Sequence, residues 1–217
     1  MTVMIVLDVS ASGNFGSIHE SKRELSAEVA AVLAFSAIQN NDKVGLLLFS
    51  DRVELFVPPK KGRMHILRLI REMLYYEPQG RGTDLSGALE YLNKVVSRRA
   101  VVFLISDFLT GDFIRPLTVS ARRHDIVALS VVDPVEESLP DVGVILLEDP
   151  ETGEQIEVDT SRRDVAKGYA DLAALRARET RRLFGARGVD SIELRTDKDY
   201  LPVLRNFFER RGHRLAA

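Results

Sequence analysis

Short apolar runs alternate along the chain with stretches in which apolar side chains recur every three or four residues. The apolar runs predict six strands, and three of these are nearly continuous in Val, Ile, Leu and Phe, as in strands buried on both faces. The predicted strand ranges are 3–7, 44–49, 52–57, 100–105, 126–132 and 191–195. Between them, helical spacing predicts amphipathic helices, such as the one with Val165, Tyr169 and Leu172 on one face. This alternation predicts a doubly wound, Rossmann-like α/β fold, with a mainly parallel sheet and helices on both faces.

Two connections depart from this alternation. The link Phe49-Ser50-Asp51-Arg52 is too short for a crossover, so the third strand should pair antiparallel with the second at the sheet edge. Residues 144–147 and 155–158 flank an Asp-Pro-Glu-Thr-Gly turn, which predicts a β-hairpin. We expect this acidic hairpin, about residues 143–159, to be appended to the main sheet and either solvated or a secondary partner surface. The chain shows no linker or repeat, and a single domain over residues 1–217 is predicted.

The amino-acid composition indicates which kinds of partner and which cellular compartment to expect. The chain has 217 residues and is 45% hydrophobic, enough for a full core, and its formal net charge is −2. It contains no cysteine, which excludes disulfides and thiolate metal sites. No apolar window approaches the roughly 18 residues of a membrane span. We expect a cytoplasmic chain that is monomeric alone and has no nucleic-acid partner. Met1 almost begins the first strand, so we expect a preceding segment in the native protein, whose full length could be membrane-associated.

Oxygen-bearing side chains follow the predicted strands, at the ends where the sites of open parallel sheets lie. The first apolar run ends at Asp8 and is followed by Ser10 and Ser12, and the fourth strand is followed by Asp107. Thr83 stands on a glycine-flanked loop that opens a helix and can reach the same edge. All five offer oxygen and none offers nitrogen or sulfur. This donor set suits a hard divalent cation, with Mg²⁺ favoured and Mn²⁺ or Ca²⁺ as alternatives.

The mixture of these groups bears on function. A cation held directly by hydroxyls and only indirectly by carboxylates keeps much of its charge, and it can accept a carboxylate from another molecule. Such a site needs no general base, so we expect a binding protein and not an enzyme. The rival class is a Mg²⁺-dependent phosphohydrolase or phosphotransferase. Ser10 stands where aspartate-nucleophile phosphatases place a second Asp as general acid, which disfavours that class.

Simpler roles exist for several of these residues. Ser10 and Ser12 could cap a helix, and Thr83 or Asp84 could cap the helix that follows them, with Asp84 the better candidate. Arg81 and Phe108 flank the proposed site, and we expect both to contact an incoming ligand. Two sets of residues are expected on the solvated surface: the histidines His19, His65, His124 and His213, and the basic helical patch Arg176, Arg178, Arg181 and Arg182.

The arrangement Asp8-x-Ser10-x-Ser12, with a separate Thr83 and Asp107, resembles the metal-ion-dependent adhesion site of von Willebrand factor A domains. The resemblance implies a sheet of order 3-2-1-4-5-6 with an antiparallel strand 3. It also implies that Ser10, Ser12 and Thr83 contact the metal directly, Thr83 chiefly when a ligand carboxylate completes the shell. Asp8 and Asp107 would act mainly through bound waters.

A narrower resemblance covers nearly the whole chain. It rests on segments such as DVSASGNFGS, NDKVGLLLFSD, RGTDLSGAL and FLISDF. These are similar to a bacterial family of uncharacterised function, of the DUF58 type, whose members carry an A domain and are commonly encoded beside MoxR-type AAA+ ATPases. The resemblance implies a protein partner that donates Asp or Glu to the metal. That partner would be a MoxR-type ATPase or its client, in an assembly or chaperone-like role.

Overall fold

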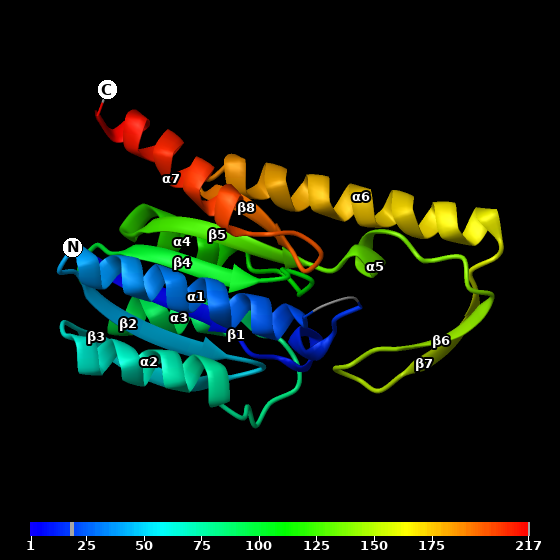
Figure 1. Ribbon diagram of the computed structural model, residues 1–217, viewed down its shortest axis with the longest axis horizontal. Helices are drawn as coiled ribbons and strands as arrows, with labels where there is room; N and C mark the ends of the chain where they lie inside the picture. The colour runs from blue at the N-terminus through cyan, green and yellow to red at the C-terminus, as the bar shows by residue number, and fades with distance from the viewer. Residues whose placement is uncertain (18–19, 217) are drawn as a thin grey trace.

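A six-stranded sheet forms the centre of the molecule, in the order β3-β2-β1-β4-β5-β8 (Figure 1). The computed structural model describes residues 1–17 and 20–216, except for the side chains of 213–216. The strands are β1 (Thr2–Asp8), β2 (Lys43–Phe49), β3 (Val53–Lys60), β4 (Val101–Ser106), β5 (Asp125–Val132) and β8 (Asp190–Arg195). Only β3 pairs antiparallel within this sheet. The predicted order and the antiparallel edge strand are confirmed.

Helices cover both faces of the sheet, because successive side chains of a buried strand point to opposite sides. The helices are α1 (Lys22–Gln39), α2 (Arg63–Tyr75), α3 (Leu85–Val95), α4 (Ile114–Arg123), α5 (Pro134–Glu137), α6 (Arg163–Gly185) and α7 (Leu201–Ala216), with a short 3₁₀ helix η1 (Ala11–Asn14). On one face, Ile5 of β1 belongs to the buried cluster of α1, α2 and α7. On the other face, Met4 and Val6 belong to the buried cluster of α3 and α4, with Phe184 from the end of α6.

Helix α6 covers the sheet only at its C-terminal end. Phe184 is fully buried, whereas Leu172 on the predicted apolar face is 56% exposed. A cavity of about 370 Å³ lies between α6 and the strands β5 and β8. The spacing of apolar residues therefore predicted the helix correctly, but it could not show that Tyr169 and Leu172 of its apolar face line a cavity.

The predicted hairpin forms a separate antiparallel sheet of β6 (Val144–Glu148) and β7 (Gln155–Asp159). In Figure 1 it extends from α5 as a long arm, and its tip points back toward the sheet edge where β1 ends. Val144, Leu146 and Ile156 are 67%, 58% and 64% exposed, so the arm is not part of the core. No described helix is long and apolar enough to cross a membrane.

Candidate metal centre

Asp8 ends β1 and organises the loop that follows it. Its Oδ1 accepts a hydrogen bond from the Ser10 amide at 3.0 Å, and its Oδ2 accepts one from the Ser106 hydroxyl at 2.7 Å. Ser106 is the last residue of the neighbouring strand β4, so this second bond fastens the two strand ends together. Each carboxylate oxygen still has lone-pair capacity for a water or a cation.

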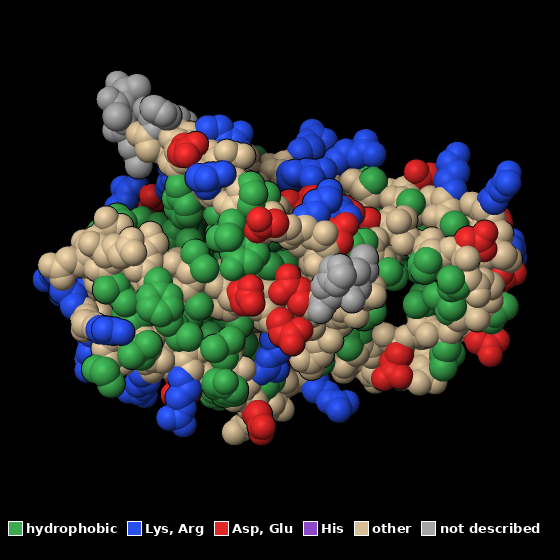
Figure 2. All heavy atoms as spheres, viewed as in Figure 1, with side chains coloured by type: hydrophobic (Ala, Val, Ile, Leu, Met, Phe, Trp, Pro, Cys, Tyr) green, Lys and Arg blue, Asp and Glu red, His purple; other side chains and the backbone are tan. Residues whose placement is uncertain are grey.

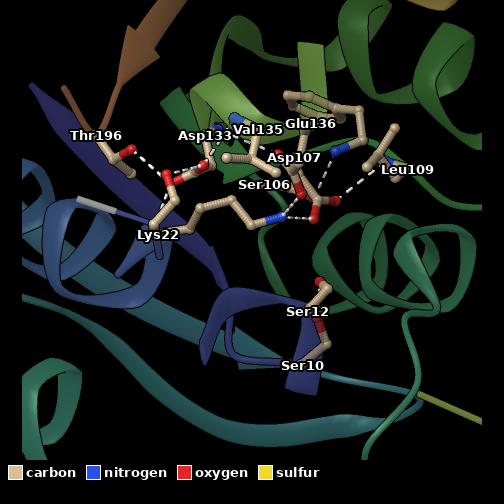
Figure 3. A network of polar contacts seen from close by, with 12 residues as sticks. Ser10, Ser12, Lys22, Ser106, Asp107, Leu109, Asp133, Val135, Glu136 and Thr196 are labelled. Carbon is tan, nitrogen blue, oxygen red and sulfur yellow. Dashed lines mark hydrogen bonds and ion pairs between the residues drawn. The ribbon is translucent and has the colours of Figure 1, made fainter. Parts of the chain in front are cut away.

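Ser10 and Ser12 turn their hydroxyls toward each other on the loop after β1 (Figure 3). Their Oγ atoms lie 3.1 Å apart. Ser10 stands at the N-cap position of η1 but makes no side-chain capping bond, so the capping role considered for it is wrong. Two hydroxyl oxygens this close together can bind one hard cation side by side.

Backbone and side-chain hydrogen bonds join three loops into one rim, which consists of residues 8–12, 80–84 and 106–110. The Ala11 amide donates to the Arg81 carbonyl at 2.9 Å. The Thr110 hydroxyl donates to the Thr83 carbonyl at 2.8 Å. Together with the Asp8–Ser106 bond, these contacts bring all five predicted residues to the C-terminal edge of the sheet. Their role as metal ligands stays a prediction.

The loop that carries Thr83 is held at both ends. Gly80 is buried, and a β-carbon there would lie 2.3 Å from the Ser50 Oγ. One oxygen of Glu54 accepts the Gly80 amide at 2.8 Å. At the other end, Asp84 caps α3 by accepting the Gly87 amide at 2.9 Å, which confirms the role expected for it. Glu54 therefore positions the loop, and no sequence pattern marked it.

The electrostatics of the rim favour a bound cation. Burial, and secondly the neighbouring charge of Asp107, raise the pKa of Asp8 to about 6. A cation beside these two carboxylates would remove much of that penalty. Among the side chains that the structure describes, no three from His, Asp or Glu group so that they could hold a metal ion by themselves. A centre here therefore needs the serine and threonine hydroxyls, and the five side chains fit a hard cation on those terms.

A buried lysine, which sequence reasoning missed, lies against this centre (Figure 3). The Lys22 Nζ is 2.7 Å from Asp107 Oδ2 and 2.5 Å from Glu136 Oε1, and its side chain is 3% exposed. Burial opposes the ammonium charge, but Asp107 and Glu136 outweigh it and raise the pKa of Lys22. The Lys22 ammonium group thus already neutralises part of the Asp107 charge. A carboxylate engaged in this way suits the predicted contact of Asp107 with a metal ion through a bound water.

Asp133, beyond the rim, connects three segments that lie near it. It is fully buried and accepts bonds from the Ser17 amide and hydroxyl, at 2.9 and 2.6 Å, and from the Thr196 hydroxyl at 2.8 Å. Burial alone would raise the pKa of Asp133, but these donors lower it. The carboxylate therefore ties the segment after β1 to the ends of β5 and β8.

The expectations that Phe108 contacts an incoming ligand and that His124 lies on the solvated surface are both wrong. Phe108 is only 5% exposed and packs edge-on against Phe184, with ring centroids 4.9 Å apart, so it is not available to an incoming ligand. His124 is 1% exposed, and burial lowers its pKa. His65 is half-buried and contacts the Val44 carbonyl, at 2.8 Å. His19 and the side chain of His213 lie outside the described part of the chain.

The cavity beneath α6 is a neighbour of the centre, not the centre itself. Of the five predicted residues, only Asp107 lines it, together with Leu109, Tyr169 and the exposed Leu172 among others. Arg181 at its border pairs with Glu193 at 3.1 Å, as expected for a solvated basic face with local ion pairs.

Comparisons with known proteins place the chain in a family. The family described as protein of unknown function DUF58 matches residues 1–180. The uncharacterized protein Rv1480 of Mycobacterium tuberculosis is 33% identical over 215 residues, which cover 96% of this chain and 67% of that protein. The uncharacterized protein MAV169 of Mycobacterium avium is 33% identical over 160 residues, which cover 71% of this chain and 93% of that protein.

Solved structures support the fold. The conserved hypothetical protein BatB from Bacteroides thetaiotaomicron superposes with a TM-score of 0.64 at 17% identity, over 97% of both chains. An aerotolerance-related membrane protein from Bacteroides fragilis superposes with a TM-score of 0.55 at 19% identity, over 80% of this chain and 88% of that one. At such identities the likeness concerns the fold alone. The chain belongs to the DUF58 family of proteins of unknown function.

Proposed function

We propose that this chain is a non-catalytic, metal-dependent protein-binding module. The observation that carries the proposal is that hydrogen bonds join three loops into one rim, and that this rim carries Asp8, Ser10, Ser12, Thr83 and Asp107. A divalent cation bound there would supply a positive charge to which an acidic side chain of a partner binds. Mg²⁺ is the cation that this donor set favours.

Each residue has a separable role in this proposal. Ser10 and Ser12 would bind the cation through their paired hydroxyls. Asp8, held by Ser10 and Ser106, and Asp107, held by Lys22, would supply negative charge through bound water. Thr83 would engage when a carboxylate arrives. The proposal gives each of these groups a binding or orienting role and assigns no reaction to the chain.

We further propose that the partner is a MoxR-type AAA+ ATPase, or a client protein of such an ATPase, in an assembly or chaperone-like role. The resemblance to a family commonly encoded beside these ATPases supports this partner, and the full-length protein would act in the cytoplasm or at its membrane. A pull-down from the native lysate in Mg²⁺ and in EDTA tests it. Retention of the ATPase or its client in Mg²⁺ alone is expected, and equal retention in both buffers contradicts it.

Calorimetric titration with Mg²⁺ and Mn²⁺ is expected to show binding, accompanied by a rise in melting temperature. The fold itself should persist in EDTA, because the buried apolar clusters on both sheet faces form the core and the metal adds only the linkage term RT ln(1 + [L]/Kd). Absence of heat and of any shift in melting temperature would contradict the proposed metal centre.

An enzyme assay tests the rival function. Metal-dependent turnover of phosphatase substrates that is lost in Asp8→Asn would favour the phosphohydrolase class.

Thr83→Ala should separate partner binding from metal binding. Thr83 is neutral, so its loss should leave the melting temperature and most of the Mg²⁺ affinity intact. Affinity for an acidic partner should fall by about 1–3 kcal/mol, as for the loss of a buried polar contact. Thr83→Ser, which keeps the hydroxyl, is the matched control and should be much milder. Equal partner affinity of wild type and Thr83→Ala in saturating Mg²⁺ would exclude Thr83 from the site.

A further inference from the structure

The tip of the acidic hairpin reaches the rim of the metal centre. The Thr83 hydroxyl donates to Oε1 of Glu151, with 2.6 Å between the oxygens. The second oxygen, Oε2, lies beside Gly82, where a β-carbon would be 3.5 Å from it. The carboxylate of Glu151 therefore lies against the loop that carries Thr83, although 68 residues separate the two in sequence.

Hydrogen bonds within the turn at the tip of the hairpin position this carboxylate. Asp149 Oδ1 accepts the Glu151 amide at 2.8 Å and the Thr152 amide at 3.2 Å. Gly153 closes the turn with a φ of 75°, a left-handed conformation that suits glycine, and its amide donates to the Asp149 carbonyl at 2.7 Å. Glu151 is thus presented by a defined turn, and it is half-buried while its hairpin neighbour Glu154 is exposed.

The arm that carries the tip stands away from the core. Figure 2 shows an opening between the hairpin and the rest of the molecule. The outward side chains of Val144, Leu146 and Ile156 are more than half exposed, so they add little apolar burial to hold the arm down. The polar contact of Glu151 with Thr83 joins the far end of the arm to the sheet.

The charge of Glu151 points to a cation. The rim already holds the carboxylates of Asp8 and Asp107, each at or just after the end of a neighbouring parallel strand. The neighbouring lysine, Lys22, is engaged by Asp107 and Glu136. A third carboxylate brought to this rim adds negative charge, which a divalent cation would neutralise. Thr83 is also the residue at which a ligand carboxylate would arrive if the rim holds a metal.

We propose that Glu151 is a carboxylate ligand that this chain supplies to its own metal centre. The inference rests on the proposed metal-dependent function. With the cation bound, Glu151 occupies the position of a partner's acidic side chain, and the hairpin closes over the rim. A partner must then displace Glu151, so the hairpin lowers the apparent affinity of the metal centre for a partner.

Mg²⁺ titration of Glu151→Gln against wild type tests the ligand role. The glutamine oxygen can still accept the Thr83 hydrogen bond, so the change removes the charge and keeps the shape. Glu151→Gln should weaken Mg²⁺ binding by about tenfold, because one anionic oxygen ligand is lost. Glu154→Gln, which removes an exposed carboxylate of the same hairpin, is the matched control and should stay within about twofold of wild type.

Cleavage of the hairpin by a protease of broad specificity, such as proteinase K, gives a second readout that reports closure directly. Mg²⁺ should slow cleavage in wild type and in Glu154→Gln, because metal favours the closed arm, and should not slow it in Glu151→Gln. If all three proteins bind Mg²⁺ equally and Mg²⁺ changes the cleavage rate of none of them, the role of Glu151 is contradicted. The proposed metal-dependent function is not affected by that result. Absence of Mg²⁺ binding in all three overturns both.

Discussion

Asp8→Asn is expected to stabilise the metal-free protein at pH 7.5 while abolishing metal binding. Burial, followed by the charge of Asp107, raises the pKa of Asp8 from 3.8 to about 6 in the folded chain. One pKa unit corresponds to about 1.4 kcal/mol, so removal of the charge should raise the free energy of unfolding by about 1–3 kcal/mol. Asparagine can still accept the Ser10 amide, and the Ser106 hydroxyl can turn to accept from its NH₂ group.

The pH dependence gives this prediction its sign. The folded chain holds the Asp8 proton to higher pH than the unfolded chain, so this group lowers stability as pH rises from about 4 to about 6. Above about pH 6 the ionised Asp8 carboxylate lowers the free energy of unfolding by the full amount, and below about pH 4 it does not lower it. The stability gain of Asp8→Asn should therefore appear at neutral pH and vanish near pH 4. Urea unfolding at both pH values measures it.

Metal dependence completes the test of Asp8. Wild type should gain stability from Mg²⁺, whereas Asp8→Asn should gain none, since one of the two carboxylates of the proposed metal centre is lost. The control is Asp141→Asn, which removes the charge of an exposed carboxylate outside the rim and should retain the Mg²⁺ response. A metal-free Asp8→Asn protein that is less stable than wild type at pH 7.5 would contradict the view that Asp8 is strained by its charge.

Lys22→Met is expected to lower the free energy of unfolding by about 3–5 kcal/mol at pH 7, the range for breaking a buried ion pair from one side. Methionine fills much of the same space, but Asp107 and Glu136 would lose the ammonium group that lies 2.7 and 2.5 Å from them. The pKa of Lys22 is raised above 10.5, so its stabilising charge is fully present at pH 7.

Two measurements separate this effect from ordinary packing loss. The deficit of Lys22→Met in urea unfolding should shrink at low pH, where Glu136, whose pKa is raised by burial, becomes protonated and needs no partner. Saturating Mg²⁺ should also recover part of it at pH 7, because a cation at the rim would neutralise Asp107. Lys94→Met, on the exposed last turn of α3, should change stability by less than about 0.5 kcal/mol. Wild-type stability in Lys22→Met would show that the buried pair contributes nothing.

Much of the fold could be predicted because its signals are local. A continuous apolar run such as Val3–Leu7 indicates a strand buried on both faces. The four-residue link Phe49–Arg52 permits only an antiparallel neighbour for β2, and the structure has that pairing. The candidate centre could be predicted for a related reason. Asp8 and Asp107 each end or follow a parallel strand, and parallel strands end at a common edge.

The sequence by itself determined the strand order through its resemblance and the hairpin through its Pro/Gly turn. It indicated four oxygen side chains of the rim through their positions at or after strand ends, and Thr83 through its place on a glycine-flanked loop that opens a helix. Only the tertiary structure decided that Lys22 is buried between two carboxylates, that Phe108 turns into the core and that Glu151 meets Thr83. Local periodicity is a property of neighbouring residues, so a single segment reveals it. Burial and ion pairing depend on groups that are distant in the chain, and the fold alone brings those groups together.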